Sequence, residues 1–223
     1  MKPRLSNRRN LALTLTEVLV IVAVAIALAI LAGLPRAKAK AIRISCLSNL
    51  KAGECGFRLW AGDNNNQYPM ELSTNRGGAR EWLLEGKVFE VFRMMSNELS
   101  TPKILFCPAD TSRTYATNFA IGFDNTNISY FLGVDAPCRD NTNVPEARMS
   151  LFLYGDRNLT NDPGPQNGIL QLTANQNARW TAGLHKYEGN ICLANGNVLQ
   201  LNNSSLREAA QTAAPATNRL VIP

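Results

Sequence analysis

The stretch LALTLTEVLVIVAVAIALAILAGL, from Leu11 to Leu34, decides how the rest of this chain can be organised. Its seventeen residues from Val18 to Leu34 carry no charge. As an α-helix rising about 1.5 Å per residue, the stretch is long enough to cover the roughly 30 Å hydrocarbon core of a bilayer. One carboxylate, Glu17, stands at the upstream edge of the apolar run. A lone acid beside a membrane span costs a few kcal/mol, so we expect Glu17 to have a function.

Basic residues flank the apolar stretch on both sides. The group before it is Lys2, Arg4, Arg8 and Arg9, and the group after it is Arg36, Lys38, Lys40 and Arg43. The formal net charge of +6 therefore falls to +2 if the residues before Leu13 are removed. Most of the basic excess is membrane-flanking, and the similar counts on the two sides do not orient the span. A nucleic-acid surface could use the remaining basic and aromatic candidates, which are Arg113, Tyr115, Arg139, Arg148 and Arg179. They are scattered in the sequence and are equally consistent with ordinary solvated surface, so no nucleic-acid partner is expected.

Two other interpretations of the N-terminus are an ordinary membrane anchor and a cleaved secretory signal. A secretory signal would use Ala37-Lys38-Ala39 as its small-residue cleavage site. Lysines and an arginine crowd that site, and the apolar run exceeds the usual 7–15 residues of such signals. Glu17 argues against both alternatives, because neither gives a reason for the carboxylate.

The length of 223 residues allows one stem and one modest globular domain. Five cysteines leave at least one thiol unpaired, and none has the C-x-x-C spacing of a zinc ligand pair, so the sequence does not indicate a zinc site. Beyond Pro35, which should kink the helix, apolar residues recur at helical spacing as far as Gly62. This stripe, which should pack on the domain, is Ile42, Cys46, Leu50, Gly53, Phe57 and Trp60.

The rest of the chain reads as a mixture of helices and strands. Helical spacing predicts a helix over 79–99. Ser204 or Ser205 could cap a second helix that ends at Ala213. Asn195-Gly196 between two apolar runs predicts a hairpin with a type I′ turn. Strands are expected over these ranges: 103–106, 129–133, 151–155, 169–172, 189–194 and 198–201. The fold class is therefore α+β, a long N-terminal helix packed on a small antiparallel sheet.

Several segments carry a resemblance to a known family. The order of basic leader, Ala12, Leu13-Thr14-Leu15-Thr16-Glu17 and apolar run resembles the prepilin signal of type IV pilins and type II secretion pseudopilins, with Ala12 where the family has Gly and Leu13 where it has Phe. Other segments resemble the pilin-like proteins abundant in Verrucomicrobia, named for an H-x9-DG motif that is matched here by His185 and Asn195-Gly196. These further segments are Cys46-Leu47-Ser48-Asn49-Leu50-Lys51, Trp60-Ala61-Gly62-Asp63-Asn64-Asn65, Tyr68-Pro69 and Cys107-Pro108-Ala109-Asp110.

The resemblance implies a structural role rather than an enzymatic one. It implies a leader over residues 1–12 removed between Ala12 and Leu13 by a prepilin peptidase that also methylates the new N-terminus. It further implies a transmembrane half over 13–34, an amphipathic half over 35–62 and a globular domain over 63–223. The protein would be single-pass in the bacterial inner membrane with its C-terminal domain in the periplasm. Its partners would be the lipid bilayer, an assembly platform and other pilin or pseudopilin subunits.

On this reading the chain is a subunit of a type II secretion pseudopilus. The alternatives are a surface type IV pilus subunit and a membrane-anchored periplasmic binding module that does not polymerise. The family role of Glu17 is to pair, in the assembled filament, with the new amino terminus of Leu13. The resemblance also implies that Cys46 and Cys107 lie close together and could form a disulfide, since both belong to segments that the family carries.

Two groups of residues are candidates for a chemical role. His185 is the only histidine and has no nucleophile or base motif beside it, so it reads as a structural residue before the hairpin and no catalytic residue is expected. Calcium is the one candidate cofactor, because Asp156, Asn158 and Asp162 could supply oxygen ligands from one loop. Their spacing does not match a known calcium loop, and such polar turns are common without metal, so we expect no metal.

Overall fold

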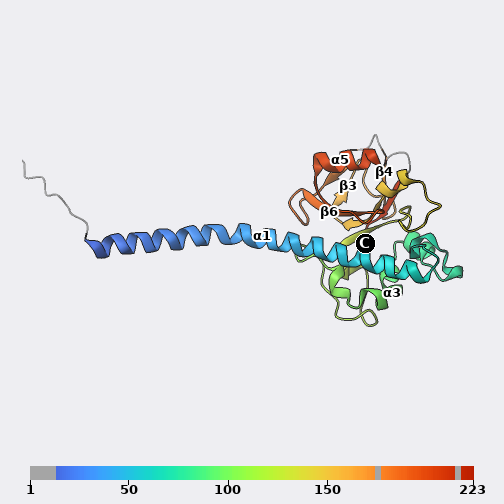
Figure 1. Cartoon of the computed structure of the whole chain (residues 1–223), viewed down its shortest axis with the longest axis horizontal. Helices are drawn as coiled ribbons and strands as arrows, with labels where there is room; N and C mark the ends of the chain where they lie inside the picture. The colour runs from blue at the N-terminus through green and yellow to red at the C-terminus, as the bar shows by residue number, and fades with distance from the viewer. Residues whose placement is uncertain (1–13, 174–176, 214–216) are drawn as a thin grey trace, which may run out of the picture. The chain divides into compact units, whose positions relative to one another are not determined.

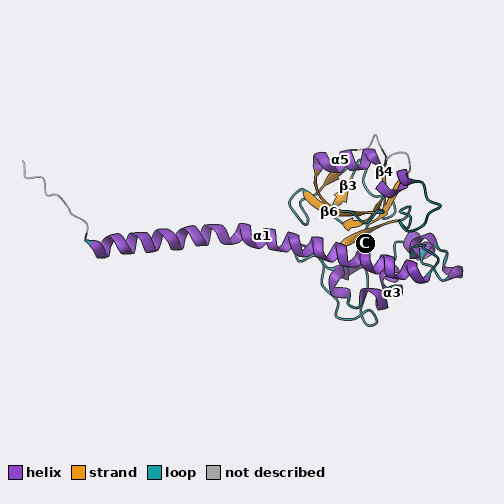
Figure 2. Cartoon of the chain, in the orientation of Figure 1, coloured by secondary structure: helices purple, strands orange, loops and turns teal. Residues whose placement is uncertain are grey.

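The computed structural model describes residues 14–173, 177–213 and 217–223 (Figure 1). Contacts divide the chain into two units, one ending at Ala41 and the other comprising Ile42–Pro223. The second unit is α+β, as the sequence predicts, with a six-stranded antiparallel sheet at its centre (Figure 2). The leader, the processing site at Ala12 and Leu13, and the start of the expected 13–34 span lie outside the described residues.

Helix α1 (Leu15–Asp63) is the longest element and runs through the boundary between the two units, with Pro35 inside it. It ends one residue beyond the predicted Gly62, where Asn65 and Asn66 adopt left-handed backbone angles with φ of 55° and 54°. Within the described part of the chain, no helix has both the length and the apolar character needed to cross a membrane. The transmembrane half over 13–34 therefore stays a prediction.

The large sheet has the strand order β4-β8-β1-β2-β6-β7, and every neighbouring pair is antiparallel. Its strands are β1 (Tyr130–Gly133), β2 (Phe152–Asp156), β4 (Ile169–Leu172), β6 (Glu188–Leu193), β7 (Val198–Asn202) and β8 (Asn218–Val221). A separate pair joins β3 (Leu159–Thr160) to β5 (Arg179–Trp180). Strands β1, β2, β4, β6 and β7 match predicted segments, whereas β3, β5 and β8 were not predicted.

The sheet is buried on both faces, which explains why β1 and β2 read as continuous runs of buried residues rather than alternating ones. On one face, α5 (Asn203–Thr212) packs with Phe131, Phe152 and Leu220 in the smaller core cluster. On the other face, the predicted stripe of α1 packs in the larger core cluster, where Cys46, Leu50 and Phe57 are fully buried. Figure 1 shows α5 and the last part of α1 on opposite sides of the sheet.

Two glycines of α1, Gly53 and Gly56, would each weaken an isolated helix by about 1 kcal/mol. The structure gives each a packing reason. A Cβ at Gly53 would lie 2.8 Å from Cζ of Tyr154, whose hydroxyl donates to the carbonyls of Asn49 and Leu50. A Cβ at Gly56 would meet the side chain of Leu99. The glycines therefore let α1 approach β2 and the small helices closely.

The predicted helix over 79–99 is wrong in its continuity. The segment forms three short helices, α2 (Arg80–Leu84), α3 (Val88–Met94) and α4 (Ser96–Leu99). Gly86 turns the chain between α2 and α3 with a φ of 80°. The predicted strand over 103–106 is also wrong. It is a 3₁₀ helix, η3 (Pro102–Leu105), with Pro102 in its first turn and Thr101 accepting the backbone N–H of Lys103. The remaining 3₁₀ turns are η1 (Pro69–Glu71), η2 (Thr74–Arg76), η4 (Asn125–Asn127) and η5 (Glu146–Ser150).

The hairpin predicted around Asn195-Gly196 is present as β6 and β7, with Cys192 opposite Val198. Its turn is not type I′, because Gly196 has a φ of 84° but Asn195 does not have a positive φ. The N–H of Gly196 donates to the carbonyl of Leu193, and the N–H of Leu193 to that of Asn197, as in a three-residue loop with a left-handed glycine. The cap of α5 also differs from the prediction, since Asn202 accepts the N–H groups of both Ser204 and Ser205.

Candidate functional site

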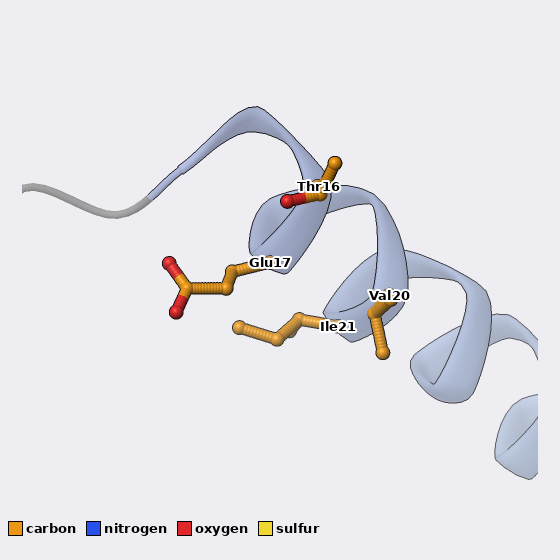
Figure 3. Close-up of a pocket in the computed structure, with 4 residues that line it drawn as sticks. All are labelled: Thr16, Glu17, Val20 and Ile21. Atoms are coloured by element: carbon orange, nitrogen blue, oxygen red, sulfur yellow. The ribbon is translucent and has the colours of Figure 1, made fainter.

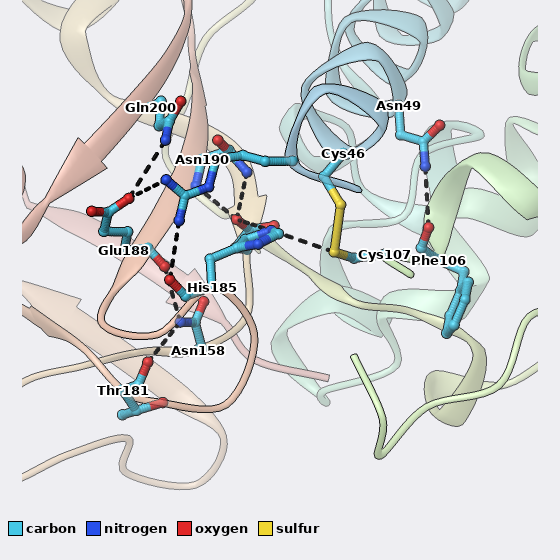
Figure 4. A network of polar contacts seen from close by, with 12 residues as sticks. Cys46, Asn49, Phe106, Cys107, Asn158, Thr181, His185, Glu188, Asn190 and Gln200 are labelled. Atoms are coloured by element: carbon cyan, nitrogen blue, oxygen red, sulfur yellow. Dashed lines mark hydrogen bonds and ion pairs between the residues drawn. A yellow bond between two sulfur atoms is a disulfide. The ribbon is translucent and has the colours of Figure 1, made fainter. Parts of the chain in front are cut away.

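The candidate site is a buried row of side chains beside α1, formed by Cys46, Cys107 and His185, which Figure 4 labels, together with Asp156. The structure joins Cys46 of α1 to Cys107 in a disulfide, with Cα atoms 5.5 Å apart. Nε2 of His185 lies 3.5 Å from Sγ of Cys107 and 3.5 Å from Oδ2 of Asp156. Both sulfurs and the carboxylate are fully buried, and His185 is 6% exposed.

The local backbone structure positions the side chains of Asp156 and His185. Asp156 is the last residue of β2, and Asn190 of β6 donates to its Oδ2 from both the backbone N–H, at 2.7 Å, and the side-chain amide, at 2.9 Å. His185 precedes two consecutive non-glycine residues in the left-handed region, Lys186 with φ 53° and Tyr187 with φ 67°. That conformation costs about 1–2 kcal/mol per residue, so packing must hold the turn that carries His185.

Burial controls the protonation of this row. It raises the pKa of Asp156 to about 7, against the hydrogen bonds from Asn190, which lower it. It lowers the pKa of His185 to about 4, helped by the nearby positive charge of Arg43. At neutral pH the imidazole is therefore neutral, with one N–H and one free lone pair. The sulfurs form a disulfide, so the row contains no free nucleophile and, in this oxidation state, serves as a crosslink.

Further contacts from α1 close the site. Arg43 donates to the carboxylate of Glu188 on β6 and, at 3.2 Å, to the carbonyl of His185. Asn49 donates from its amide to the carbonyl of Phe106, next to Cys107, at 3.1 Å (Figure 4). The first half of the H-x9-NG motif thus lies beside the disulfide and is hydrogen-bonded to α1 through Arg43.

The second half of the motif, Asn195-Gly196, also reaches α1. The carbonyl of Asn195 accepts from Nη1 of Arg139 at 3.1 Å, and Arg139 pairs with Glu54 of α1 at 3.4 Å. A Cβ on Gly196 would lie 2.8 Å from Oε1 of Glu54, so only glycine fits this contact without a shift. Both halves of the motif, at His185 and at Gly196, therefore lie against the same helix.

Glu17 has a local role at the start of α1. The N–H of Thr14 donates to Oε2 of Glu17 at 2.8 Å, and the hydroxyl of Thr14 accepts the N–H of Glu17 at 3.3 Å. These reciprocal bonds form a capping box, which the sequence analysis did not consider. Figure 3 shows the carboxylate extending from the first turn beside Ile21, in a shallow hollow that Thr16 and Val20 also line.

The three residues weighed for calcium have different partners. Asp156 is bound by Asn190, and the amide of Asn158 donates to the carbonyls of Thr181 and Glu188 at 2.9 and 3.3 Å. Asp162 is exposed and pairs with Arg179 at 2.8 Å. The described residues contain one group of three histidine, cysteine or acidic side chains close enough to hold a metal ion, and that group is Cys46, Cys107 and His185.

The arginines weighed for nucleic acid have acceptors within the chain. Arg113 donates to the carbonyl of Pro223, Arg139 to that of Asn195 and Arg148 to that of Asp135, while Arg179 pairs with Asp162.

The sequence analysis did not predict that Arg43 and Glu54 belong to the site. It also did not predict that Asp156 lies beside His185. Arg43 was counted as a membrane-flanking charge and Asp156 as part of a polar loop. The one available signal was helical spacing, because Arg43, Cys46, Asn49 and Leu50 recur on one side of α1. Comparisons with protein-family models, with curated proteins and with solved structures find no match for this chain.

Proposed function

We propose that this chain is a structural subunit of a pilin-like filament, a pseudopilus of the type II secretion kind, anchored in the inner membrane by its N-terminal helix before assembly. The observation that carries the proposal is the surface of the first part of α1. The large apolar side chains from Leu15 to Leu34 are between 42% and 77% exposed. A helix that is apolar on all sides needs lipid or other helices around it.

The second part of α1 supports the same proposal. From Arg43 to Trp60 it is fixed in the α+β unit by burial, a disulfide and two ion-paired arginine contacts. A subunit built in this way could transmit a pull on its helix directly to its folded domain. That property suits a filament subunit, and the bare apolar segment supplies the surface for packing against other copies.

Glu17 offers the sharpest test, because two explanations for it make different predictions. A helix cap needs only an acceptor at this position, so Glu17→Gln should preserve it. A charge pair with the amino terminus of Leu13 needs the carboxylate, since a charge carried into an apolar core costs several kcal/mol unless it is paired. Glu17→Gln and Glu17→Leu should therefore both insert in the membrane and both be lost from filaments.

The assay compares the sheared filament fraction with the membrane fraction in cells that make each variant. The matched control is Glu85→Gln, which removes an exposed surface carboxylate paired with Lys87 and should leave filaments unchanged. Normal incorporation of Glu17→Gln would reject the charge pair in favour of the cap. Wild-type protein found only as a membrane monomer would reject the filament and favour a membrane-anchored binding module.

Mass spectrometry of the mature N-terminus tests processing. The proposal expects a chain that begins at Leu13 with a methylated amino group. A chain beginning after Ala39, or one that retains Met1, would contradict it.

A further inference from the structure

Three potential metal ligands converge where α1 meets the sheet, and a buried carboxylate lies beside one of them. Sγ of Cys46, Sγ of Cys107 and Nε2 of His185 all lie within 4.8 Å of one another. Oδ2 of Asp156 lies 3.5 Å from the same imidazole nitrogen. Two sulfurs, an imidazole nitrogen and a carboxylate oxygen are the ligand types that Zn²⁺ prefers.

Two of the separations have the lengths found around a tetrahedral ion. With Zn–S near 2.3 Å and Zn–N or Zn–O near 2.0–2.2 Å, adjacent ligand atoms of a tetrahedral site lie about 3.3–3.8 Å apart. The distance from Sγ of Cys107 to Nε2 of His185 is 3.5 Å, and that from Nε2 to Oδ2 of Asp156 is also 3.5 Å. These are two of the six edges of a tetrahedron. Opening the disulfide would let the two sulfurs separate to a third, and Asp156, which is not part of the group of three close ligands, would have to move toward the sulfurs to complete the site.

The surroundings of Asp156 point to a ligand as well. This carboxylate is fully buried, and within the described residues its Oδ1 has no hydrogen-bond partner. Asn190 holds Oδ2 with two hydrogen bonds, which is the second layer of support that metal-binding side chains commonly have. The unpaired Oδ1 makes this buried carboxylate costly, and an ion bound by both oxygens of Asp156 would remove that cost.

Two thiolates, one carboxylate and a neutral imidazole around Zn²⁺ leave one net negative charge. Arg43 lies nearby, where it donates to the backbone carbonyl of His185 and pairs with Glu188. An ion in this position would be enclosed and held by four protein groups, which is the arrangement of a structural zinc site rather than a catalytic one.

We propose that the dithiol form of this chain binds one Zn²⁺ through Cys46, Cys107, His185 and Asp156, so that the same crosslink between α1 and the domain can be made by a metal ion or by a disulfide. Each thiol loses its proton to solvent as its sulfur binds the ion. The disulfide form cannot bind the ion in this way, because its sulfurs are bonded to each other. A phosphine or dithiol reductant supplies the two electrons that convert one form into the other.

The test uses the full-length chain in detergent, reduced with a phosphine and freed of metal, with Co²⁺ as a spectroscopic probe and Zn²⁺ as competitor. The expected result is one Co²⁺ per chain with a thiolate-to-cobalt absorption band, lost on addition of one equivalent of Zn²⁺. Cys107→Ser should abolish the band, and His185→Ala should weaken Zn²⁺ binding by more than the roughly 10–100-fold typical of removing a supporting partner. The matched control is Cys55→Ser, which removes an exposed free thiol outside the cluster.

A second measurement on the wild-type chain does not depend on the folding of variants. Zn²⁺ should protect Cys46 and Cys107 of the reduced chain from alkylation, mapped by mass spectrometry, while Cys55 stays reactive. The proposal is overturned if the reduced chain gives no thiolate-to-cobalt band, if the band survives Cys107→Ser, or if Zn²⁺ leaves the alkylation of Cys46 and Cys107 unchanged. Equal binding by the oxidised chain would also overturn it, since the ion would then be bound elsewhere.

Discussion

Replacing Gly53 by alanine should destabilise the protein, although the same change stabilises most helices. In an isolated helix, alanine is favoured over glycine by about 1 kcal/mol. Here the new Cβ would lie 2.8 Å from Cζ of Tyr154, a fully buried ring that has to move. Overpacking of this kind costs about 1–3 kcal/mol, and disturbing the hydrogen bonds from Tyr154 to α1 adds about 1 kcal/mol. The net loss in the free energy of unfolding should be about 1–3 kcal/mol.

The control for Gly53→Ala lies on the same helix. A Cβ at Gly62 would meet nothing within 4 Å, so Gly62→Ala should be neutral or stabilising by up to about 1 kcal/mol. Thermal unfolding followed by circular dichroism should separate the two variants, because each kcal/mol shifts the melting temperature by about 2–4 °C in a domain of this size. The sign of the shift should differ between them.

A double-mutant cycle tests the cause. Tyr154→Phe removes the hydroxyl that is closest to Gly53, so Gly53→Ala should cost less in that background than in the wild type. If Gly53→Ala is as stable as Gly62→Ala, or if its cost is the same with and without the hydroxyl, then close approach of Tyr154 is not the reason for a glycine at this position.

Three further predictions concern the α+β unit. Burial raises the pKa of Asp110, but hydrogen bonds from Arg157 and Ser112 outweigh it and leave that pKa below its usual value. The pair therefore stabilises the fold above about pH 4. In urea unfolding, Arg157→Ala should have a free energy of unfolding about 3–5 kcal/mol below that of the wild type at pH 7, and this difference should shrink as the pH falls below about 4. A difference that does not depend on pH would contradict this. Cys107→Ser should lower the free energy of unfolding in non-reducing buffer by about 4 kcal/mol, since the disulfide closes a 61-residue separation. Reduction of the wild-type protein should lower its free energy of unfolding by the same amount, which checks that the disulfide is the cause. Gly196→Ala should lower the melting temperature, because the position has a φ of 84° and faces Glu54, whereas unchanged melting would mean that the turn adapts.

Periodicity in the sequence was enough to predict the packing of α1. The stripe from Ile42 to Trp60 repeats every three or four residues, and the structure buries it as that spacing requires. Short apolar runs were less informative. The segment 103–106 has the composition of a strand, but Pro102 and the Thr101 cap make it helical, and the Arg219-Leu220-Val221 strand pairs only with partners distant in the chain.

The candidate site was harder to predict than the fold, because its members are brought together by tertiary contacts. Cys46, Cys107 and His185 are separated by 61 and 78 residues, so no metal-binding spacing exists in the sequence. Asp156 is followed in the sequence by polar residues, a pattern that suggests a calcium loop with its sequence neighbours. Its actual partner, Asn190, is 34 residues away on the adjacent strand. Only the pairing of β2 with β6 places them together.

The fixed spacing of the motif follows from the strand between its two halves. His185 comes three residues before β6 and Asn195 two residues after it, so the length of β6 sets where each half meets α1. One half lies beside Cys46, and the other beside Glu54. β6 is also paired on both sides, with β2 and β7, so an inserted or deleted residue would move the side chains beyond it to the opposite face of the sheet. Either His185 would lose Asp156 and the sulfurs, or Gly196 would lose its place against the helix. Strand register therefore requires the nine-residue interval. With this interval, the contacts at His185 and at Gly196 can both form and together fix α1 to the domain.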